Sequence, residues 1–155
     1  MRSQRRGSVL LLPAAGRAAG SDISRAAIGH PRARLGSRAA AVRWLSEDLL
    51  TWDPGRSWRV WHDRAAYHFL TTAAEQGRYR QVLDAATGPA AVAVLGCFAP
   101  DEPGRCSGLP VARYSATDLA GHLNGWALIS QAREEHATPA GVMRPFTWVA
   151  LRKQS

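Results

Sequence analysis

Apolar and polar positions follow helical or strand spacing over most of the chain after residue 22. Residues 73–86 place apolar side chains on one face at helical spacing, which predicts an amphipathic helix. Residues 91–98 are continuously apolar, as is typical of a strand buried on both faces. The other predicted strands are short apolar runs bounded by turn residues, at 41–45, 58–61, 126–132 and 146–151.

Two further helices are predicted from their capping residues. Asp22 can accept the orphan amide hydrogens of a helix over residues 25–35, in which Pro31 should introduce a kink or an early end and after which Gly36 should terminate it. A capping pattern also begins a short helix over residues 115–123. The alternation of helices and strands predicts an α/β sheet that is mostly parallel, and the last two strands, joined without a helix, predict an antiparallel pair.

Residues 1–21 contain an apolar run at 9–12 but show no helical or strand periodicity, and they are rich in small and basic side chains. We therefore expect a poorly ordered basic segment over 1–21 and one domain over 22–155. Pro13 cuts the apolar run too short for a secretion signal, so we expect a cytoplasmic protein.

The net charge of +8 invites a nucleic-acid function, but its distribution argues against one. Residues 1–40 contain eight arginines and only Asp22 as an acidic residue, so they carry +7 of the total. Lys153 is the only lysine, whereas a surface that binds phosphate normally uses both basic residue types. A basic nucleic-acid-binding module stays an alternative, and the composition does not favour it.

The spacing of the cysteines argues against a metal-binding protein, and the length of the apolar runs argues against a membrane protein. Cys97 and Cys106 lie outside any CxxC pattern and have no histidine partner at zinc spacing, so we expect no metal and reduced thiols. No apolar run approaches the roughly 18 residues of a membrane span, so we expect no membrane partner.

Several local sequences, taken in order, resemble those of small bacterial class I S-adenosylmethionine-dependent methyltransferases. The resemblance spans residues 22–153. It is carried by SDIS at 21–24, VRWLSEDL at 42–49, VWHDRAAYHFL at 60–70, CSGLPV at 106–111 and PFTW at 145–148.

This resemblance implies an α/β fold with an incomplete Rossmann-like methyltransferase sheet, mostly parallel with an antiparallel C-terminal strand pair. Family members carry a first strand and a glycine-rich loop before the position of Asp22, and residues 1–21 contain no such motif. Gly16 and Gly20 do not reproduce its spacing. The chain therefore looks N-terminally truncated, with a domain that lacks the first strand and the loop. Alternatively, residues 9–12 fill the vacant strand position.

The resemblance also implies S-adenosylmethionine as cofactor and assigns residues to it. Asp22 matches the carboxylate that binds the ribose hydroxyls, with Ile23 beside it, and Asp48 matches the acceptor of the adenine amine, with Leu49 against the ring. Asp63 follows the fourth strand, where α/β sheets place ligands. From the residues alone, Asp22 is equally a helix cap and Asp48 a turn cap.

His62 and His68 are the candidate catalytic residues, because an imidazole can take a proton from an acceptor near neutral pH. Two structural alternatives stay open: His68 packs beside Phe69, and Asp63 forms an ion pair with Arg64 that only holds the loop.

The sequence supports three hypotheses for the function of this chain. The first is S-adenosylmethionine-dependent methyl transfer to a small-molecule acceptor, with activity reduced by the missing glycine-rich loop. The second is an inactive remnant of such an enzyme, and the third is the basic nucleic-acid-binding module. The sequence does not identify the acceptor or the oligomeric state.

Overall fold

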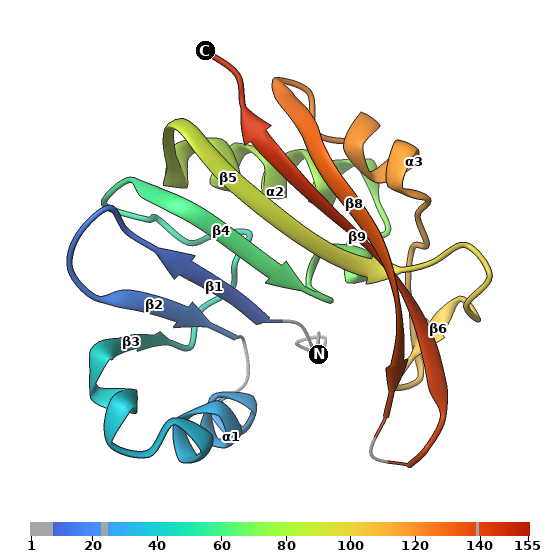
Figure 1. Cartoon of the computed structure of the whole chain (residues 1–155), viewed down its shortest axis with the longest axis horizontal. Helices are drawn as coiled ribbons and strands as arrows, with labels where there is room; N and C mark the ends of the chain where they lie inside the picture. The colour runs from blue at the N-terminus through green and yellow to red at the C-terminus, as the bar shows by residue number, and fades with distance from the viewer. Residues whose placement is uncertain (1–7, 23–24, 139) are drawn as a thin grey trace.

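The computed structural model describes residues 8–22, 25–138 and 140–155, and its main feature is a seven-stranded sheet with helices on both sides (Figure 1). The strands of this sheet are β1 (Ser8–Leu12), β2 (Ala18–Ser21), β3 (Val42–Leu45), β4 (Trp58–Arg64), β5 (Thr87–Phe98), β8 (Trp126–Ala137) and β9 (Met143–Lys153). The short strands β6 (Arg105–Cys106) and β7 (Leu109–Pro110) pair separately. The α-helices are α1 (Arg25–Leu35), α2 (Ala73–Ala86) and α3 (Ala116–Gly121), and 3-10 turns span Gly36–Ala41 and Tyr67–Phe69.

The strand order in the sheet is β3-β2-β1-β4-β5-β9-β8. Pairing directions show that β2, β3, β4, β5 and β8 run one way, while β1 and β9 run the other. This confirms the predicted mixed α/β fold with a mostly parallel sheet and an antiparallel C-terminal pair. The last two strands are longer than their apolar runs, because β8 and β9 pair from Trp126 to Ala137, well beyond the part of them that packs in the core.

Strand β1 occupies the centre of the sheet and runs antiparallel to both neighbours. Val9 pairs with Ser21 of β2 on one side and with Asp63 of β4 on the other. The sequence predicted a poorly ordered segment over residues 1–21, whereas from residue 8 onward most of it is strand. The reason is the unfilled ladder between β2 and β4, which an apolar strand can complete in either direction. A short turn joins β1 to β2, with Gly16 at φ 96°.

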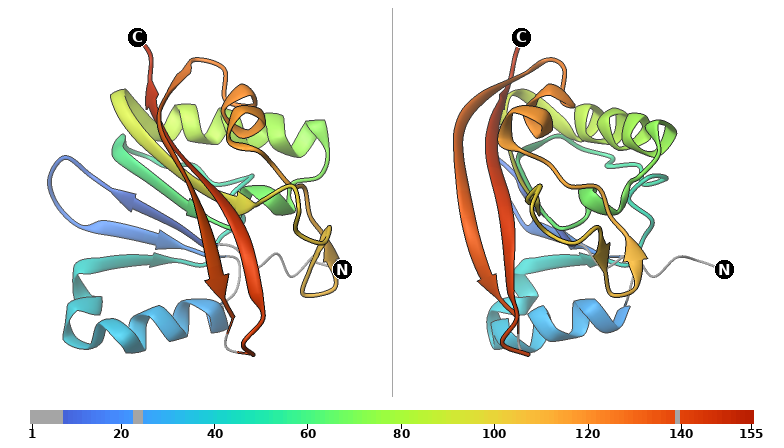
Figure 2. Two further views of the ribbon diagram at one scale, coloured as in Figure 1. Left: turned by 45° about the vertical axis from the view of Figure 1, so that its right-hand side comes forward. Right: turned by 90° about the vertical axis from the view of Figure 1, so that its right-hand side faces the viewer.

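One face of the sheet, here called the inner face, carries the main core. Leu11 and Trp61 on this face are fully buried and share a cluster with Tyr79 of α2 and Leu119 of α3. Figure 2 shows α2 and α3 together on this side of the strands. Helix α2 begins with a capping box between Thr72 and Glu75 and matches the predicted helix over residues 73–86.

The opposite, outer face of the sheet is covered only at one end, by α1. Ile28 of α1 is buried there, with 8% of its surface exposed. The helix has the predicted bounds and continues past Pro31 to Leu35, so the shortening that was one of the two expected effects of the proline is not found: losing one amide donor does not stop a helix anchored on the sheet. Gly36 follows with φ 55°, the left-handed conformation predicted for the residue that ends the helix.

In the part of the chain that the structure describes, the cysteines form no disulfide and the helices are short. Cys97 is buried, Cys106 is partly exposed, and both are free. No described helix combines the length and the apolar character needed to cross a membrane.

The central position of β1 predicts unequal effects of two neighbouring leucines. Leu11 is fully buried on the inner face, whereas Leu12 points to the outer face and is 40% exposed. Leu11→Ala should lower the free energy of unfolding by about 2–5 kcal/mol, because it leaves a cavity in the core. Leu12→Ala is the matched control and should cost less than about 1 kcal/mol. Urea unfolding measures both, and equal losses would contradict the register of β1.

Candidate functional site

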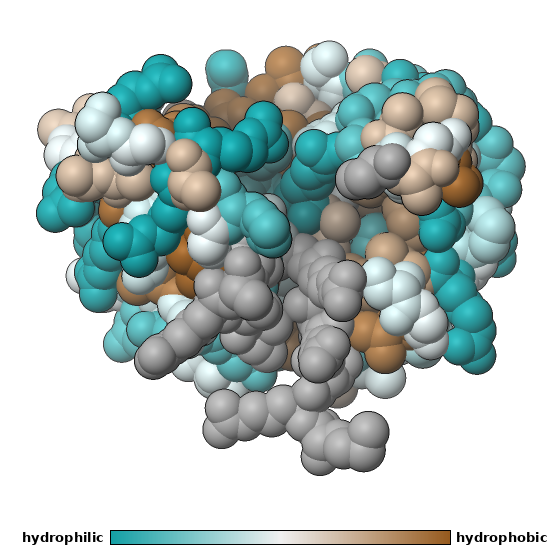
Figure 3. Space-filling model, turned by 90° about the horizontal axis from the view of Figure 1, so that it is seen from below, coloured by the Kyte–Doolittle hydropathy of each residue, from teal (hydrophilic) through white to brown (hydrophobic). Residues whose placement is uncertain are grey.

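A pocket of about 480 Å³ lies on the outer face, at the edge of the sheet where β2 and β4 end. Its floor is formed by outer-face residues of β1, β2 and β4, and its wall by α1. Figure 3 views the molecule from the side on which α1 lies and shows a hollow between the lobe with α1 and the lobe with the β8–β9 hairpin. Carboxyl ends of parallel strands are the common place for ligands in α/β sheets.

The floor of the pocket is flat and apolar because a tryptophan lies over a glycine. Gly20 pairs with Leu10 on one side and with Trp44 on the other. A Cβ at Gly20 would come within 3.2 Å of the Trp44 ring, so a larger residue would displace the ring. The Trp44 indole donates to the carbonyl oxygen of Ala39 at 3.1 Å, which fixes the ring against the wall beside α1.

The structure places Asp22 in the pocket and does not place Asp48 there. Asp22 directly follows β2, is 9% exposed, and its amide donates to the Leu45 carbonyl at 3.1 Å, which ties it to the end of β3. Asp48 lies in the turn beyond β3, where Oδ1 accepts the amide hydrogen of Leu50 at 3.0 Å. Leu49 packs against the inner-face core. Ile23 lies outside the described residues.

Asp63 lies at the same end of the sheet but on the inner face, fully buried. Its carboxylate accepts the Tyr79 hydroxyl at 2.6 Å and the amides of Ala66 and Tyr67 at 2.8 and 3.1 Å. Burial raises the pKa of Asp63 to about 6, although these three donors act in the opposite direction. The geometry makes Asp63 the organiser of the loop after β4, because it holds the first two amides of that loop.

His62 and Arg64 stand on the outer face of β4, two residues apart, and both line the pocket. Burial lowers the pKa of His62 below its usual value, and the nearby Arg64 guanidinium lowers it further. His62 is therefore a neutral imidazole at pH 7, able to accept a proton. Arg64 faces away from Asp63, so the alternative of an Asp63–Arg64 ion pair is not what the structure shows.

His68 is fully buried among aromatic rings and does not reach the pocket. Its ring lies 4.6 Å from that of Phe69 and 4.5 Å from that of Phe98. Nδ1 accepts the Phe98 amide hydrogen at 3.3 Å, and burial lowers the pKa of His68 to about 4. The surroundings of His68 are therefore those of the structural alternative, in which it packs beside Phe69.

A second group of side chains, here called the rim cluster, adjoins the pocket across β5 and consists of Arg64, Glu134, His136 and Trp148. Arg64 donates to Nδ1 of His136 at 3.0 Å and lies 3.9 Å from a Glu134 oxygen. The Trp148 indole donates to the other Glu134 oxygen at 2.6 Å. This cluster could not be predicted from the sequence, because its residues meet only through the pairing of β4 with β5, β5 with β9 and β9 with β8.

The pocket arginines were also missed as site residues. Arg34 and Arg38 are four residues apart, at the end of α1 and in the turn that follows it, and both line the pocket. Gly36, with φ 55°, separates the two arginines and ends the α-helix between them, so helical spacing gives no signal that they meet at the pocket. Within the described residues, no three His, Cys, Asp or Glu side chains are grouped to hold a metal ion.

Comparison with known proteins places the fold. No family model matches the chain, and no curated protein matches it. Among solved structures, N-methyltransferase NodS from Bradyrhizobium japonicum WM9 is similar with a TM-score of 0.68 at 12% identity, covering 87% of this chain and 72% of that one. An S-adenosylmethionine-dependent methyltransferase from Methanosarcina mazei gives 0.65 at 16% identity, covering 88% and 81%.

A third similar structure contains ligands. It is 1,6-didemethyltoxoflavin-N1-methyltransferase from Burkholderia thailandensis, with bound 1,6-didemethyltoxoflavin and S-adenosylhomocysteine. Its TM-score is 0.62 at 15% identity, covering 87% of this chain and 60% of that one. These likenesses establish that the chain has the fold of the class I methyltransferases, as the resemblance predicted.

The buried Asp63 predicts a specific pH dependence of stability. Since the folded chain holds the Asp63 proton more tightly than the unfolded chain, the free energy of unfolding should fall as pH rises through about 6. Asp63→Asn removes this titration, so the wild type should lose up to about 3 kcal/mol relative to the variant between pH 4 and pH 7.5. Urea unfolding at several pH values measures the difference.

Asp53→Asn is the control for this experiment, because Asp53 is exposed and accepts only the nearby amide of Gly55 at 3.1 Å. Its stability should follow the wild-type pH profile. Parallel profiles for wild type and Asp63→Asn would show that the buried carboxyl does not titrate in this range.

Proposed function

We propose that this chain binds S-adenosylmethionine in the outer-face pocket and transfers its methyl group to a small-molecule acceptor. The observation that carries the proposal is the position of Asp22, a largely buried carboxylate at the end of β2, in the pocket of a methyltransferase fold. Structures with this fold contain S-adenosylhomocysteine, the demethylated form of the cofactor. The similar methyltransferase from Burkholderia thailandensis has the small molecule 1,6-didemethyltoxoflavin bound, which supports a small acceptor here.

The residues present fit the nucleoside part of the cofactor. A carboxylate can accept hydrogen bonds from both ribose hydroxyls, and among the described residues that line the pocket Asp22 is the one with a carboxylate. Trp44 and Ile28 offer apolar surface to an adenine ring from the sheet and from α1. Bound S-adenosylmethionine would supply a methyl group activated by its positively charged sulfur.

The protein's own contribution to the chemistry is positioning and proton transfer. Alignment of an acceptor with the methyl group can supply much of the rate enhancement, and the pocket walls exclude water from the reacting atoms. His62 is neutral at pH 7 and lines the pocket, so it is the residue that accepts the proton of an acceptor hydroxyl or amine at a ring nitrogen.

A second candidate is an inactive remnant, and one observation favours it. The turn between β1 and β2 lacks the spacing of the glycine-rich loop that the family carries before the position of Asp22, and β1 runs antiparallel to both of its neighbours. Backbone amides of such a loop approach the methionine part of the cofactor closely. Without them, cofactor binding depends on the nucleoside contacts, and the two candidates differ in whether those contacts suffice.

Calorimetric titration with S-adenosylhomocysteine tests the proposal. Wild type should bind saturably, and Asp22→Asn should weaken binding about 10- to 100-fold, because a charged acceptor contributes roughly 1.5–3 kcal/mol. Asp48→Asn is the matched control and should leave the affinity unchanged, since Asp48 does not line the pocket.

Two outcomes would overturn this assignment. Absence of binding at millimolar ligand supports the inactive remnant. An equal loss for Asp48→Asn and Asp22→Asn would place the nucleoside outside the described pocket.

A further inference from the structure

The charge of the pocket does not match the cofactor alone. Among the described residues, its charged lining residues are Arg34, Arg38 and Arg64 against Asp22, and Glu134 offsets part of the charge of Arg64 from 3.9 Å, which still leaves an excess of positive charge. S-adenosylmethionine itself carries a sulfonium and an ammonium against one carboxylate, so its net charge is also positive. Like charges brought together in a partly enclosed site are unfavourable unless an anion accompanies them. An anionic second ligand would balance both.

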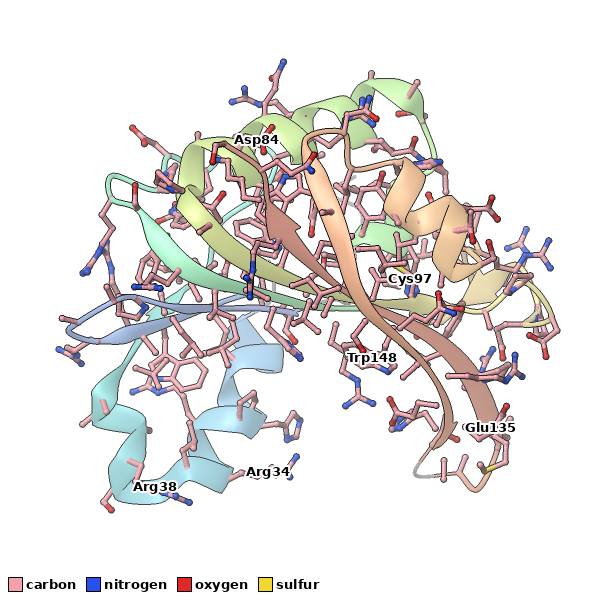
Figure 4. The ribbon with its side chains drawn as sticks, turned by 45° about the horizontal axis from the view of Figure 1, so that its top comes forward. Arg34, Arg38, Asp84, Cys97, Glu135 and Trp148 are labelled. Atoms are coloured by element: carbon pink, nitrogen blue, oxygen red, sulfur yellow. The ribbon has the colours of Figure 1, made fainter. Side chains whose placement is uncertain are left out.

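Trp148 provides a flat aromatic surface beside the pocket. A Cβ at Gly96 would lie 2.6 Å from the Trp148 ring, so the ring rests directly on the backbone of β5. Phe146 stacks near it at 6.2 Å with an interplanar angle of 25°, and His62 lies 5.6 Å away. Figure 4 shows Trp148 beneath the sheet, on the side where Arg34 and Arg38 lie. The ring is held in place and partly exposed.

Arg64 connects this surface to the pocket. In the sheet, Arg64 of β4 lies opposite Gly96 of β5, and Gly96 lies opposite Trp148 of β9. Arg64 and Trp148 therefore flank the same position of β5. The guanidinium of Arg64 lies 5.8 Å from the Phe146 ring and is held by His136, while the Arg64 side chain is 42% exposed. The 3.9 Å separation from Glu134 is too long for a hydrogen bond, so that carboxylate does not occupy the guanidinium fork.

We infer that the methyl acceptor is a planar aromatic molecule with a carboxylate or similar anionic group, bound against the Trp148 ring with its anionic group at Arg64. This inference rests on the proposed function. The guanidinium of Arg64 binds the anionic group through paired N–H donors, and the Trp148 ring stacks on the aromatic ring. His62 lies between this position and the floor of the pocket, because it lines the pocket and contacts Trp148. An acceptor bound here presents its nucleophilic group to the imidazole.

Three probe molecules, tested without cofactor, separate the two contacts. They are 4-hydroxybenzoate, its uncharged analogue 4-hydroxybenzamide, and the non-aromatic anion cyclohexanecarboxylate. Saturation-transfer NMR and calorimetry should show saturable binding of 4-hydroxybenzoate and at least about tenfold weaker binding of the other two. Equal affinity for all three would overturn the inference, as would no binding of 4-hydroxybenzoate at millimolar concentration.

Variants locate the binding. Arg64→Gln should weaken 4-hydroxybenzoate about tenfold or more and leave 4-hydroxybenzamide unchanged, because only the charge contact is lost. Trp148→Ala should weaken both aromatic probes, whereas Trp148→Phe keeps an aromatic surface and should retain most of the binding. Arg59→Gln, an exposed arginine on the same strand, is the matched control and should change nothing.

Folding is checked by the melting transition of each variant, and Arg64→Gln and Trp148→Phe keep the test valid if Trp148→Ala does not fold. An equal effect of Arg59→Gln and Arg64→Gln would reduce the result to general charge attraction and contradict the site. Failure here, with S-adenosylhomocysteine still bound, leaves the proposed function intact. Binding of 4-hydroxybenzoate without any binding of S-adenosylhomocysteine would support an aromatic-anion site and overturn methyl transfer.

Discussion

The hydrogen-bond ladder at the centre of the sheet is the constraint on which the rest of the structure depends. Strands β2 and β4 each need a partner on the side that faces the other, and β1 supplies both, pairing with β4 over its whole length and with β2 over residues 9–11. Without β1, two buried strand edges would keep unpaired amides and carbonyls in the core, which is costly. Leu11 also closes the inner-face core at this position.

The direction of β1 shapes the site as well as the sheet. Because β1 runs antiparallel, its first residue, Ser8, lies at the edge where β2 and β4 end, and pairs with Arg64. Its outer-face residues become the pocket floor, together with Gly20 and His62. The sheet of a class I methyltransferase fold is thus completed by a hairpin. This hairpin does not give the close approach of backbone to ligand that a glycine-rich loop provides.

Helices and buried strands could be predicted from local pattern, while the centre of the sheet could not. The helix at 73–86 and the strand at 91–98 follow from spacing and from continuous apolar character, and both are found. For residues 9–12, apolar character was visible but pairing was not, because a short strand has no sequence signal for its direction. The sequence therefore leaves two predictions open, a missing central strand or residues 9–12 in its place, and the structure has β1 in that place.

The site residues divide in a similar way. Asp22 and His62 both line the pocket, and the rule that α/β sheets bind ligands at the ends of strands is what predicted them as site residues. Asp63 also lies near the end of a strand, but its side chain points to the inner face and is buried. Side chains alternate between the two faces along a strand, so neighbouring residues such as His62 and Asp63 have opposite surroundings. Arg64 and Trp148 lie far apart in the chain and meet only through the pairing of β5 with β9.

The central claim is that the outer-face pocket holds the cofactor nucleoside, and an NMR titration with S-adenosylhomocysteine tests it most directly. The indole N–H signal of Trp44 and the amide signal of Gly20 should shift saturably, since both lie on the pocket floor. The indole signals of Trp52 and Trp126, which belong to the inner-face core, should stay in place. Shifts confined to Trp52 and Trp126, or no shift at any concentration, would contradict the claim.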